Sequence, residues 1–224
     1  MTEPSSLSAS ERAYRAVRDR IVEGSFPPGT MLGEATLAGD LGVSRTPVRT
    51  ALARLQDEGW ITIYPKRGAL VQGLTERSVA ELADARLVLE TTGVKRASET
   101  QRARLADRLD AAIADQREAC AAEDVRRFVA LMLAFHRTFV EAGGNGVLLE
   151  LYDRLSDRHS FVLFASGERL LSRCEEIIAE HEALVRHLRA GDAAGFAEAL
   201  RDHISETGAT PVAAFSVEGV TSRG

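Results

Sequence analysis

Hydrophobic residues recur at helical spacing in three short segments near the start of the chain. The first segment carries Ala13, Val17 and Ile21 on one stripe. A second, shorter segment spans residues 34–41. The third spans residues 44–58 and starts with a serine, a residue that suits the N-cap position. The pattern therefore predicts three helices, with a tight turn between the last two.

The spacing then changes from helical to alternating. Residues 60–64 alternate as in a strand, a turn is expected at residues 65–68, and residues 69–71 return as a second strand. Three helices followed by a two-stranded hairpin are typical of a winged helix-turn-helix domain.

The third predicted helix has two different faces. Arginine can bind guanine or phosphate through two parallel hydrogen bonds, and threonine can reach base edges or phosphates. An ordinary solvated face would also carry arginines, but the tight turn and the basic hairpin tip favour DNA recognition. At 100° per residue the outward face holds Arg45, Thr46 and Arg49, and the packed face holds Val48, Ala51, Leu52 and Leu55.

After Gly73 the chain becomes long stretches of alanine, leucine, arginine and glutamate at helical spacing. We expect a domain boundary here, with a winged helix-turn-helix domain at residues 1–73 and an all-helical domain at residues 74–224. The fold class expected is mainly α. Six helices are predicted in the second domain, at residues 76–99, 102–122, 124–142, 146–165, 168–190 and 193–207.

Composition limits the function classes. The chain has 224 residues, of which 45% are hydrophobic and 27% charged, and no apolar run reaches the ~18 residues of a membrane-spanning helix. Only two cysteines are present, Cys120 and Cys174, so neither a disulfide framework nor a cysteine-rich zinc site is expected. With no secretory signal at the start, we expect a cytoplasmic protein that does not contact membranes. The net charge of −5 excludes a globally basic coat but not a local basic face.

The residues of the first domain resemble a known family. Residues 28–38, 41–52 and 55–60 closely resemble the amino-terminal domain of GntR-family bacterial transcription regulators. The resemblance implies a homodimer on a pseudo-palindromic double-stranded DNA operator, with each recognition helix in a major groove and each wing tip in a minor groove. Thr50 and Ala35 depart from the family, which usually has glutamate at the first position and in some members arginine at the second. The residues implied to contact DNA are Arg45, Thr46, Arg49, Lys66, Arg67 and Gly68.

The second domain is similar to the FadR-type carboxy-terminal domain of the same regulators, known as FCD. The resemblance is carried by residues 85–90, 134–137, 180–184 and 200–203. It implies a helical domain that binds a small-molecule effector. In many FCD domains one aspartate and three histidines hold a divalent metal. The matching histidines are His136, His181 and His203, whereas the aspartate position is occupied by Met132.

Met132 leaves the metal question open. A thioether is a poor ligand for Zn, Ni or Mn, but three imidazoles suffice for tetrahedral zinc with one open position. Alternatively, the histidines bind an anionic effector directly. Met132 itself is expected either beside the effector or simply in the core. We interpret His159 and His187 as surface or packing groups.

Arg86 is a candidate effector-binding residue. By resemblance it faces the effector cavity, where its guanidinium could pair with a carboxylate. The alternative is an intrahelical salt bridge with Glu90, four residues further on.

These features together predict a DNA-binding transcriptional regulator, a repressor, controlled by a small organic acid. An enzyme is not expected, because the chain lacks a His-Glu-x-x-His motif, a Gly-x-Ser-x-Gly elbow and a phosphate-binding loop. Two alternatives remain: a metal-dependent hydrolase fused to a DNA-binding domain, and a DNA-binding protein without an effector.

Overall fold

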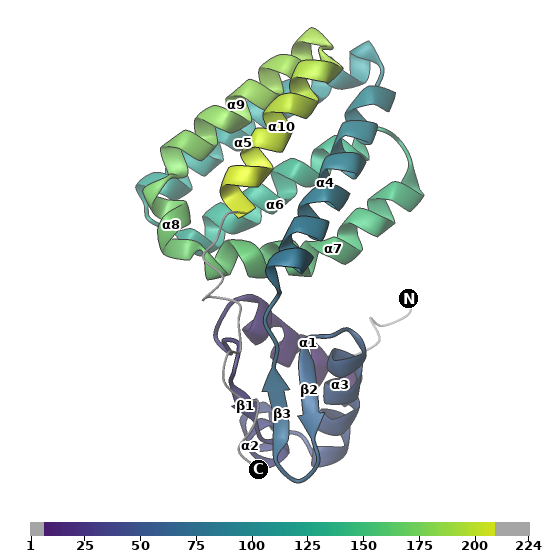
Figure 1. The fold of residues 1–224 in the computed structure, drawn as a ribbon, viewed down its shortest axis with the longest axis vertical. Coiled ribbons are helices and arrows are strands. Elements are labelled where there is room, and N and C mark those ends of the chain that lie inside the picture. Colours follow the sequence, from purple (N-terminus) through teal and green to yellow (C-terminus); the bar gives the residue numbers. More distant parts are fainter. Residues whose placement is uncertain (1–6, 209–224) are drawn as a thin grey trace, which may run out of the picture. The chain divides into compact units, whose positions relative to one another are not determined.

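The computed structural model describes residues 7–208, which form two compact units (Figure 1). The chain passes from one unit to the other between Glu76 and Arg77.

The first unit contains three helices and three strands. The helix α3 packs on α1, on α2 and on the strand β2. Four side chains of α3 are buried at this contact, as its apolar spacing predicts: Val48, Ala51, Leu52 and Leu55. The elements are α1 (Ala9–Val22), β1 (Met31–Leu32), α2 (Glu34–Leu41), α3 (Arg45–Asp57), β2 (Ile61–Tyr64) and β3 (Gly68–Val71).

The strands form an antiparallel sheet in the order β1-β3-β2. The sequence predicted the hairpin of β2 and β3, in which Tyr64 pairs with Gly68. It did not predict β1, whose Met31 pairs with Leu70 on the other edge of β3. A strand of two residues is too short for its alternation to be recognised in the sequence.

The second unit is all-helical within the described residues, as expected. The sequence predicted six helices, but the fifth is broken at Arg173 into α8 and α9. The helix α5 packs on α6 and α9, α7 packs on α6, and α10 packs on α9. The bounds are α4 (Glu76–Arg96), α5 (Glu99–Ala121), α6 (Val125–Glu141), α7 (Gly146–Ala165), α8 (Gly167–Ser172), α9 (Cys174–Ala190) and α10 (Ala193–Gly208).

The core of the second unit gathers around α6. Phe128, Phe135 and Phe139 are fully buried there, together with Met132. The helix α4 approaches α6 so closely that a Cβ at Gly93 would collide with the backbone of Phe139. This tight crossing places the buried face of α4 directly against α6.

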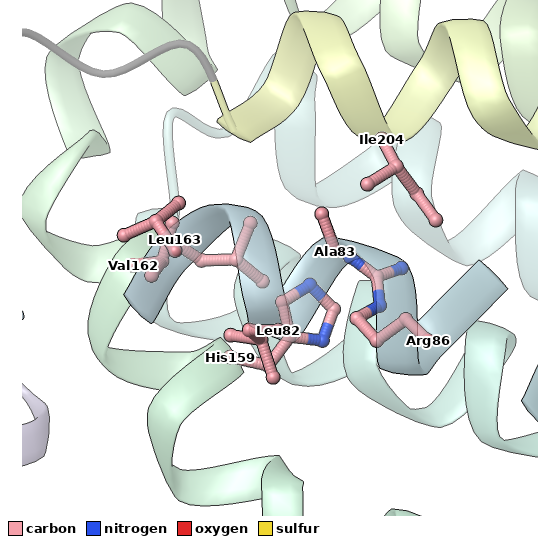
Figure 2. Close-up of a pocket in the computed structure, with 8 residues that line it drawn as sticks. Leu82, Ala83, Arg86, His159, Val162, Leu163 and Ile204 are labelled. Carbon is pink, nitrogen blue, oxygen red and sulfur yellow. The ribbon is translucent and has the colours of Figure 1, made fainter. Parts of the chain in front are cut away.

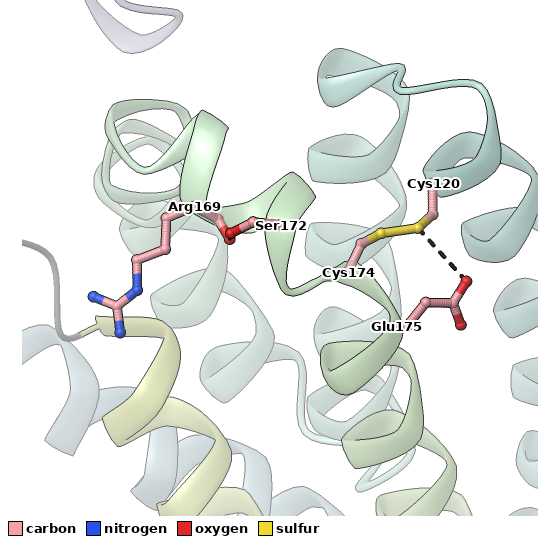
Figure 3. The surroundings of a disulfide bond; sticks show 5 residues. All are labelled: Cys120, Arg169, Ser172, Cys174 and Glu175. Carbon is pink, nitrogen blue, oxygen red and sulfur yellow. Dashed lines mark hydrogen bonds between the residues drawn. A yellow bond between two sulfur atoms is a disulfide. The ribbon is translucent and has the colours of Figure 1, made fainter.

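Cys120 and Cys174 form a disulfide, with their Cα atoms 6.0 Å apart (Figure 3). The expectation of no disulfide was wrong, because helix packing brings together two cysteines that are 54 residues apart in the sequence. Among the described helices none is both long and apolar enough to cross a membrane.

Candidate recognition face and histidine cluster

The outward face of α3 begins at its first turn. Arg45, Thr46 and Arg49 are all exposed there, opposite the buried face of the same helix. The guanidinium of Arg49 donates from Nε to Oε2 of Glu34, over 2.7 Å. Glu34 is the first residue of α2, and no pattern in the sequence pointed to this contact. One arginine of the face is therefore held by a carboxylate of the neighbouring helix.

The hairpin tip presents two basic side chains. Lys66 and Arg67 are exposed, and the turn is closed by a hydrogen bond from the Arg67 amide to the carbonyl of Tyr64. Gly68 has a φ of +118°, and a Cβ there would lie 2.5 Å from the carbonyl oxygen of Leu32. Glycine is thus required at this position by the close approach of β1.

Three histidines from three helices meet inside the second unit. His136 comes from α6, His181 from α9 and His203 from α10, and all three are buried. One ring nitrogen of each lies within 4.8 Å of the other two. Histidines that are far apart in the sequence are therefore close enough to hold one ion.

Two of these rings are oriented by carboxylates. His136 Nδ1 lies 2.8 Å from Glu90 Oε2, and His203 Nδ1 lies 2.6 Å from Glu180 Oε2. An ionised carboxylate can only accept, so each Nδ1 then carries the proton. The two Nε2 atoms lie 3.1 Å apart, within hydrogen-bond distance of each other. With both Nδ1 atoms protonated, both Nε2 atoms can instead bind one cation.

The third ring repeats the arrangement with an amide. His181 Nδ1 lies 2.7 Å from Oε1 of Gln116, and this amide oxygen accepts a hydrogen bond from the ring. His181 Nε2 is buried and has no hydrogen-bond partner. A buried acceptor without a partner costs on the order of 1–3 kcal/mol, so a ligand for this atom is expected.

Burial sets the charge of the cluster. It lowers the pKa of His136, His181 and His203 well below the usual value, so these rings are neutral at pH 7. Burial also raises the pKa of Glu90, against the opposing effect of the nearby Arg86 guanidinium. Neutral imidazole is the form that binds metal.

The residues present therefore fit a divalent ion held by three imidazoles. The ring nitrogens converge, the rings are neutral, and each Nδ1 is held by a second group, as is usual for metal-binding histidines. Met132, at the family's aspartate position, is 1% exposed and packs in the core with Phe135 and Phe139. It offers no carboxylate, so the candidate ligands in this part of the structure are the three imidazoles.

Arg86 forms the salt bridge with Glu90 that was one of its two expected roles. Its Nε donates to Glu90 Oε1 over 3.1 Å, and this salt bridge is buried rather than exposed. Tyr152 donates to the same Glu90 oxygen over 3.3 Å. The other arm of the guanidinium, Nη2, is buried without a hydrogen-bond partner. One arm of Arg86 is thus fixed to Glu90, while the other is available to an acceptor.

Arg86, whose Nη2 has no hydrogen-bond partner, lines a pocket (Figure 2). The pocket lies between α4, α7 and α10 and is small, with a cavity volume of about 20 Å³, which holds roughly one water molecule. His159 lines it as well and is only 4% exposed, so it is not a surface group, and its Nδ1 has no partner. The lining residues are Val79, Leu82, Ala83, Arg86, His159, Val162, Leu163 and Ile204.

His187, the other histidine set aside in the sequence analysis, is partly exposed. Its Nδ1 lies 2.9 Å from Asp192 Oδ2 near the end of α9. It takes no part in the cluster.

Comparison with known proteins gives both units a family. Residues 9–71 match the model of bacterial regulatory proteins of the gntR family, and residues 81–206 match that of the FCD domain. The gluconate operon transcriptional repressor of Bacillus subtilis is 31% identical over 206 residues, which cover 90% of this chain and 84% of the repressor. The repressor GlaR of Escherichia coli is 26% identical over 202 residues, covering 85% of this chain and 90% of GlaR.

A solved structure shares the fold over most of the chain. Escherichia coli McbR/YncC superposes with a TM-score of 0.71 at 21% identity, covering 90% of this chain and 95% of that one. With both units matched, the chain belongs to the GntR family of bacterial regulatory proteins and is a DNA-binding transcriptional regulator with an FCD domain.

Proposed function

We propose that the protein is a cytoplasmic repressor that binds a pseudo-palindromic operator as a homodimer and is controlled by a small organic acid. In this proposal residues 1–73 bind DNA, and residues 74–224 bind the effector and form the dimer. Residues 209–224 lie outside the described residues. The observation that carries the proposal is the exposed arginine face of α3, backed by a buried apolar face, in a chain of this family.

On the DNA side, Arg45, Thr46 and Arg49 would read bases in the major groove. Arg49 would exchange its hydrogen bond to Glu34 for a base or phosphate, because the present pair is largely exposed. Lys66 and Arg67 would enter the adjacent minor groove, where Gly68 lets the wing backbone approach closely. Phosphate contacts of this kind make affinity strongly dependent on salt.

In the helical unit, His136, His181 and His203 would hold one divalent ion, with Zn, Ni and Mn as candidates. When bound, such an ion supplies positive charge and an open coordination position for water or a carboxylate. Three neutral imidazoles favour zinc or nickel over manganese, which prefers oxygen ligands.

The effector would bind beside Arg86 and His159, in the neighbouring pocket, which must widen to admit it because its present volume is about 20 Å³. Arg86 Nη2 and His159 Nδ1 both lack partners and both line this pocket, so they suit a carboxylate with an adjoining polar group. We take gluconate as the first probe, because the Bacillus subtilis relative is named for a gluconate operon. Met132, buried in the core, would contribute only by shaping the space beside His136.

Control of DNA binding requires that the effector bind the DNA-competent and incompetent states with different affinities. The pocket is lined from α4, the helix that directly follows the first unit in the chain. A shift of α4 on effector binding would therefore reach the DNA-binding unit through the chain itself.

The test of the proposal is selection from a randomised duplex pool with the full chain. We expect enrichment of an inverted repeat whose half-sites lie about one helical turn, or a multiple of it, apart. The matched control is the double variant Arg45→Ala with Arg49→Ala, which keeps the buried face of α3. Equal enrichment by both proteins would contradict the recognition face, and enrichment of single half-sites would contradict the dimer.

The main alternative class is a metal-dependent hydrolase. Such an enzyme would need a general base beside the ion, and the two carboxylates that contact the cluster, Glu90 and Glu180, are already bonded to His136 and His203. Turnover of candidate esters or amides by the zinc-loaded protein, lost in His181→Ala, would favour the enzyme instead.

A further inference from the structure

One covalent bond joins two helices of the second unit. Cys120 lies at the end of α5 and Cys174 is the first residue of α9, and their sulfurs form a disulfide (Figure 3). Both side chains are nearly buried, at 8% and 7% exposure. They are the two cysteines of the chain, so no other thiol competes for either partner.

The same two helices carry a hydrogen bond of the histidine cluster. Gln116 precedes Cys120 by four residues, which is one turn of α5, and His181 follows Cys174 by seven residues, which is two turns of α9. Residues at these spacings share a helix face. The disulfide and the bond from His181 to Gln116 therefore lie in one α5–α9 interface, one or two turns apart.

The ion pairs across this interface lie at the surface. Arg117 pairs with Glu182, and Arg189 pairs with Asp107 and Asp110, all through largely exposed side chains. Exposed ion pairs hold helices together weakly. The helical path is also interrupted just before α9, because α8 ends at Ser172. The disulfide is thus the covalent restraint at this end of α9, and it acts beside the apolar packing of Ile177 and Ile178.

We propose that Cys120 and Cys174 are a reversible redox pair that sets the metal affinity of the histidine cluster by fixing Gln116 against His181. The proposal rests on the metal site and the regulatory role proposed above. A transcriptional regulator works beside DNA, in a compartment that keeps thiols reduced, and disulfides found there are usually transient. The reduced pair is then the resting form, and an oxidant converts it to the form seen in the structure.

The oxidant we name is hydrogen peroxide, which is small enough to reach nearly buried sulfurs. One thiolate attacks a peroxide oxygen and breaks the O–O bond, which forms a sulfenic acid and releases one molecule of water after protonation. The second thiol then attacks the sulfenic sulfur, the S–S bond forms, and the oxygen leaves as a second water. Two electrons pass from the sulfurs to the peroxide, and a dithiol reductant returns them.

Oxidation is expected to raise metal affinity. With the disulfide closed, α9 holds His181 Nδ1 on Gln116 and points Nε2 at the other two rings. Loss of a group that orients a ligand typically costs about 10–100-fold in affinity, so partial loosening on reduction should cost roughly 3–10-fold.

The experiment compares the full chain in its two redox forms. Protein is oxidised with hydrogen peroxide or reduced and desalted, free thiols are counted by alkylation and mass spectrometry, and the Zn²⁺ affinity is measured by competition with a chromogenic chelator. We expect peroxide to consume both thiols and the oxidised form to bind Zn²⁺ more tightly. Failure to form the disulfide, or equal Zn²⁺ affinity in the two forms, would overturn the proposal.

Three variants assign the effect to the right contact. Cys120→Ser should bind like the reduced protein and ignore peroxide. Gln116→Met should bind Zn²⁺ more weakly and lose the difference between the redox forms, because the contact being tuned is absent. Arg117→Gln removes the Glu182 pair in the same interface and should keep the full difference. A redox difference that survives in Gln116→Met would contradict the route through His181.

Amide hydrogen exchange distinguishes a failure of the redox proposal from a failure of the metal site. If neither form binds Zn²⁺, the metal site fails, and the redox pair is then judged on the metal-free protein. Slower exchange at residues 174–181 in the oxidised form supports the coupling of the disulfide to His181. Equal exchange there in both forms overturns it.

Discussion

The two units each contain an arginine bonded to a glutamate, in opposite surroundings. Arg49 and Glu34 are 66% and 31% exposed, whereas Arg86 and Glu90 are 5% and 0% exposed. The exposed pair can dissociate at little cost and release its guanidinium to another partner. The buried pair cannot, since an unpaired buried charge is strongly unfavourable. The first unit therefore presents its arginine–glutamate pair at the surface, and the second unit buries its pair in the interior.

The comparison predicts its largest effect at the buried pair. Glu90→Ala should destabilise the second unit by about 3–5 kcal/mol, because it leaves the Arg86 charge buried and also removes the acceptor of His136 Nδ1. Chemical denaturation followed by circular dichroism measures this loss. Arg86→Met combined with Glu90→Met should recover part of it, and equal loss in the double variant would show that packing rather than charge is responsible.

The second effect is a pH dependence confined to the second unit. Burial lowers the folded-state pKa of His136, His159, His181 and His203 well below the usual value, so the unfolded chain binds more protons than the folded one below about pH 6.5. Metal-free stability should therefore fall as pH falls below this value, with each such histidine contributing about 1.4 kcal/mol per pH unit.

The first unit of the same chain serves as the control for this prediction. All five histidines lie after residue 73, so the first unit should show no such dependence between pH 5 and 7. Hydrogen exchange of α3 and of α6 in one sample compares the two units directly. A parallel loss of protection in α3 would contradict the assignment of the pH effect to the buried histidines.

The third effect is on DNA. Arg49→Ala should weaken operator binding by about 1–3 kcal/mol if the side chain reads a base, while Arg54→Ala, on the same helix but paired with Glu11 and Glu58, should change it little. Fluorescence anisotropy at fixed salt measures both. Equal weakening by the two variants would place the contact elsewhere on α3.

The smallest effect is expected at the exposed pair. Glu34→Gln should change the stability of the first unit by less than about 1 kcal/mol, in contrast to the buried glutamate. Thermal unfolding of this variant checks the claim. A loss as large as that of Glu90→Ala would mean that exposure does not explain the difference between the two pairs.

The same contrast explains what could be predicted from the sequence. The faces of α3 follow from local spacing, and the structure buries Val48 and Leu55 and exposes Arg45 as predicted. The hairpin of β2 and β3 could be predicted in the same way. The strand β1 was missed because its two residues are too few to show alternation.

The buried site depended on contacts that no local pattern reveals. The three histidines were identified by resemblance to FCD domains, whereas their partners were not. Gln116 is 65 residues from His181, and Glu90 is 46 residues from His136. Glu180 is adjacent to His181 but orients His203 on the next helix. Such pairings depend on how the helices pack, and one sequence does not specify that packing.

His159 and Arg173 show the same limit in two other ways. His159 matched no family position, yet burial places it in the Arg86 pocket. The break at Arg173 interrupts a stretch whose composition stays helical on both sides, and it falls one residue before the disulfide.

The metal content of the full chain tests the central claim most directly, namely that the enclosed cluster is a binding site rather than part of the core. The chain is dialysed with Zn²⁺, freed of excess ion and analysed by elemental mass spectrometry beside His181→Ala and the matched control His187→Ala. The account predicts one ion per chain in the parent and in His187→Ala, and none in His181→Ala. A parent protein without zinc, or a His181→Ala variant that retains it, would contradict the account.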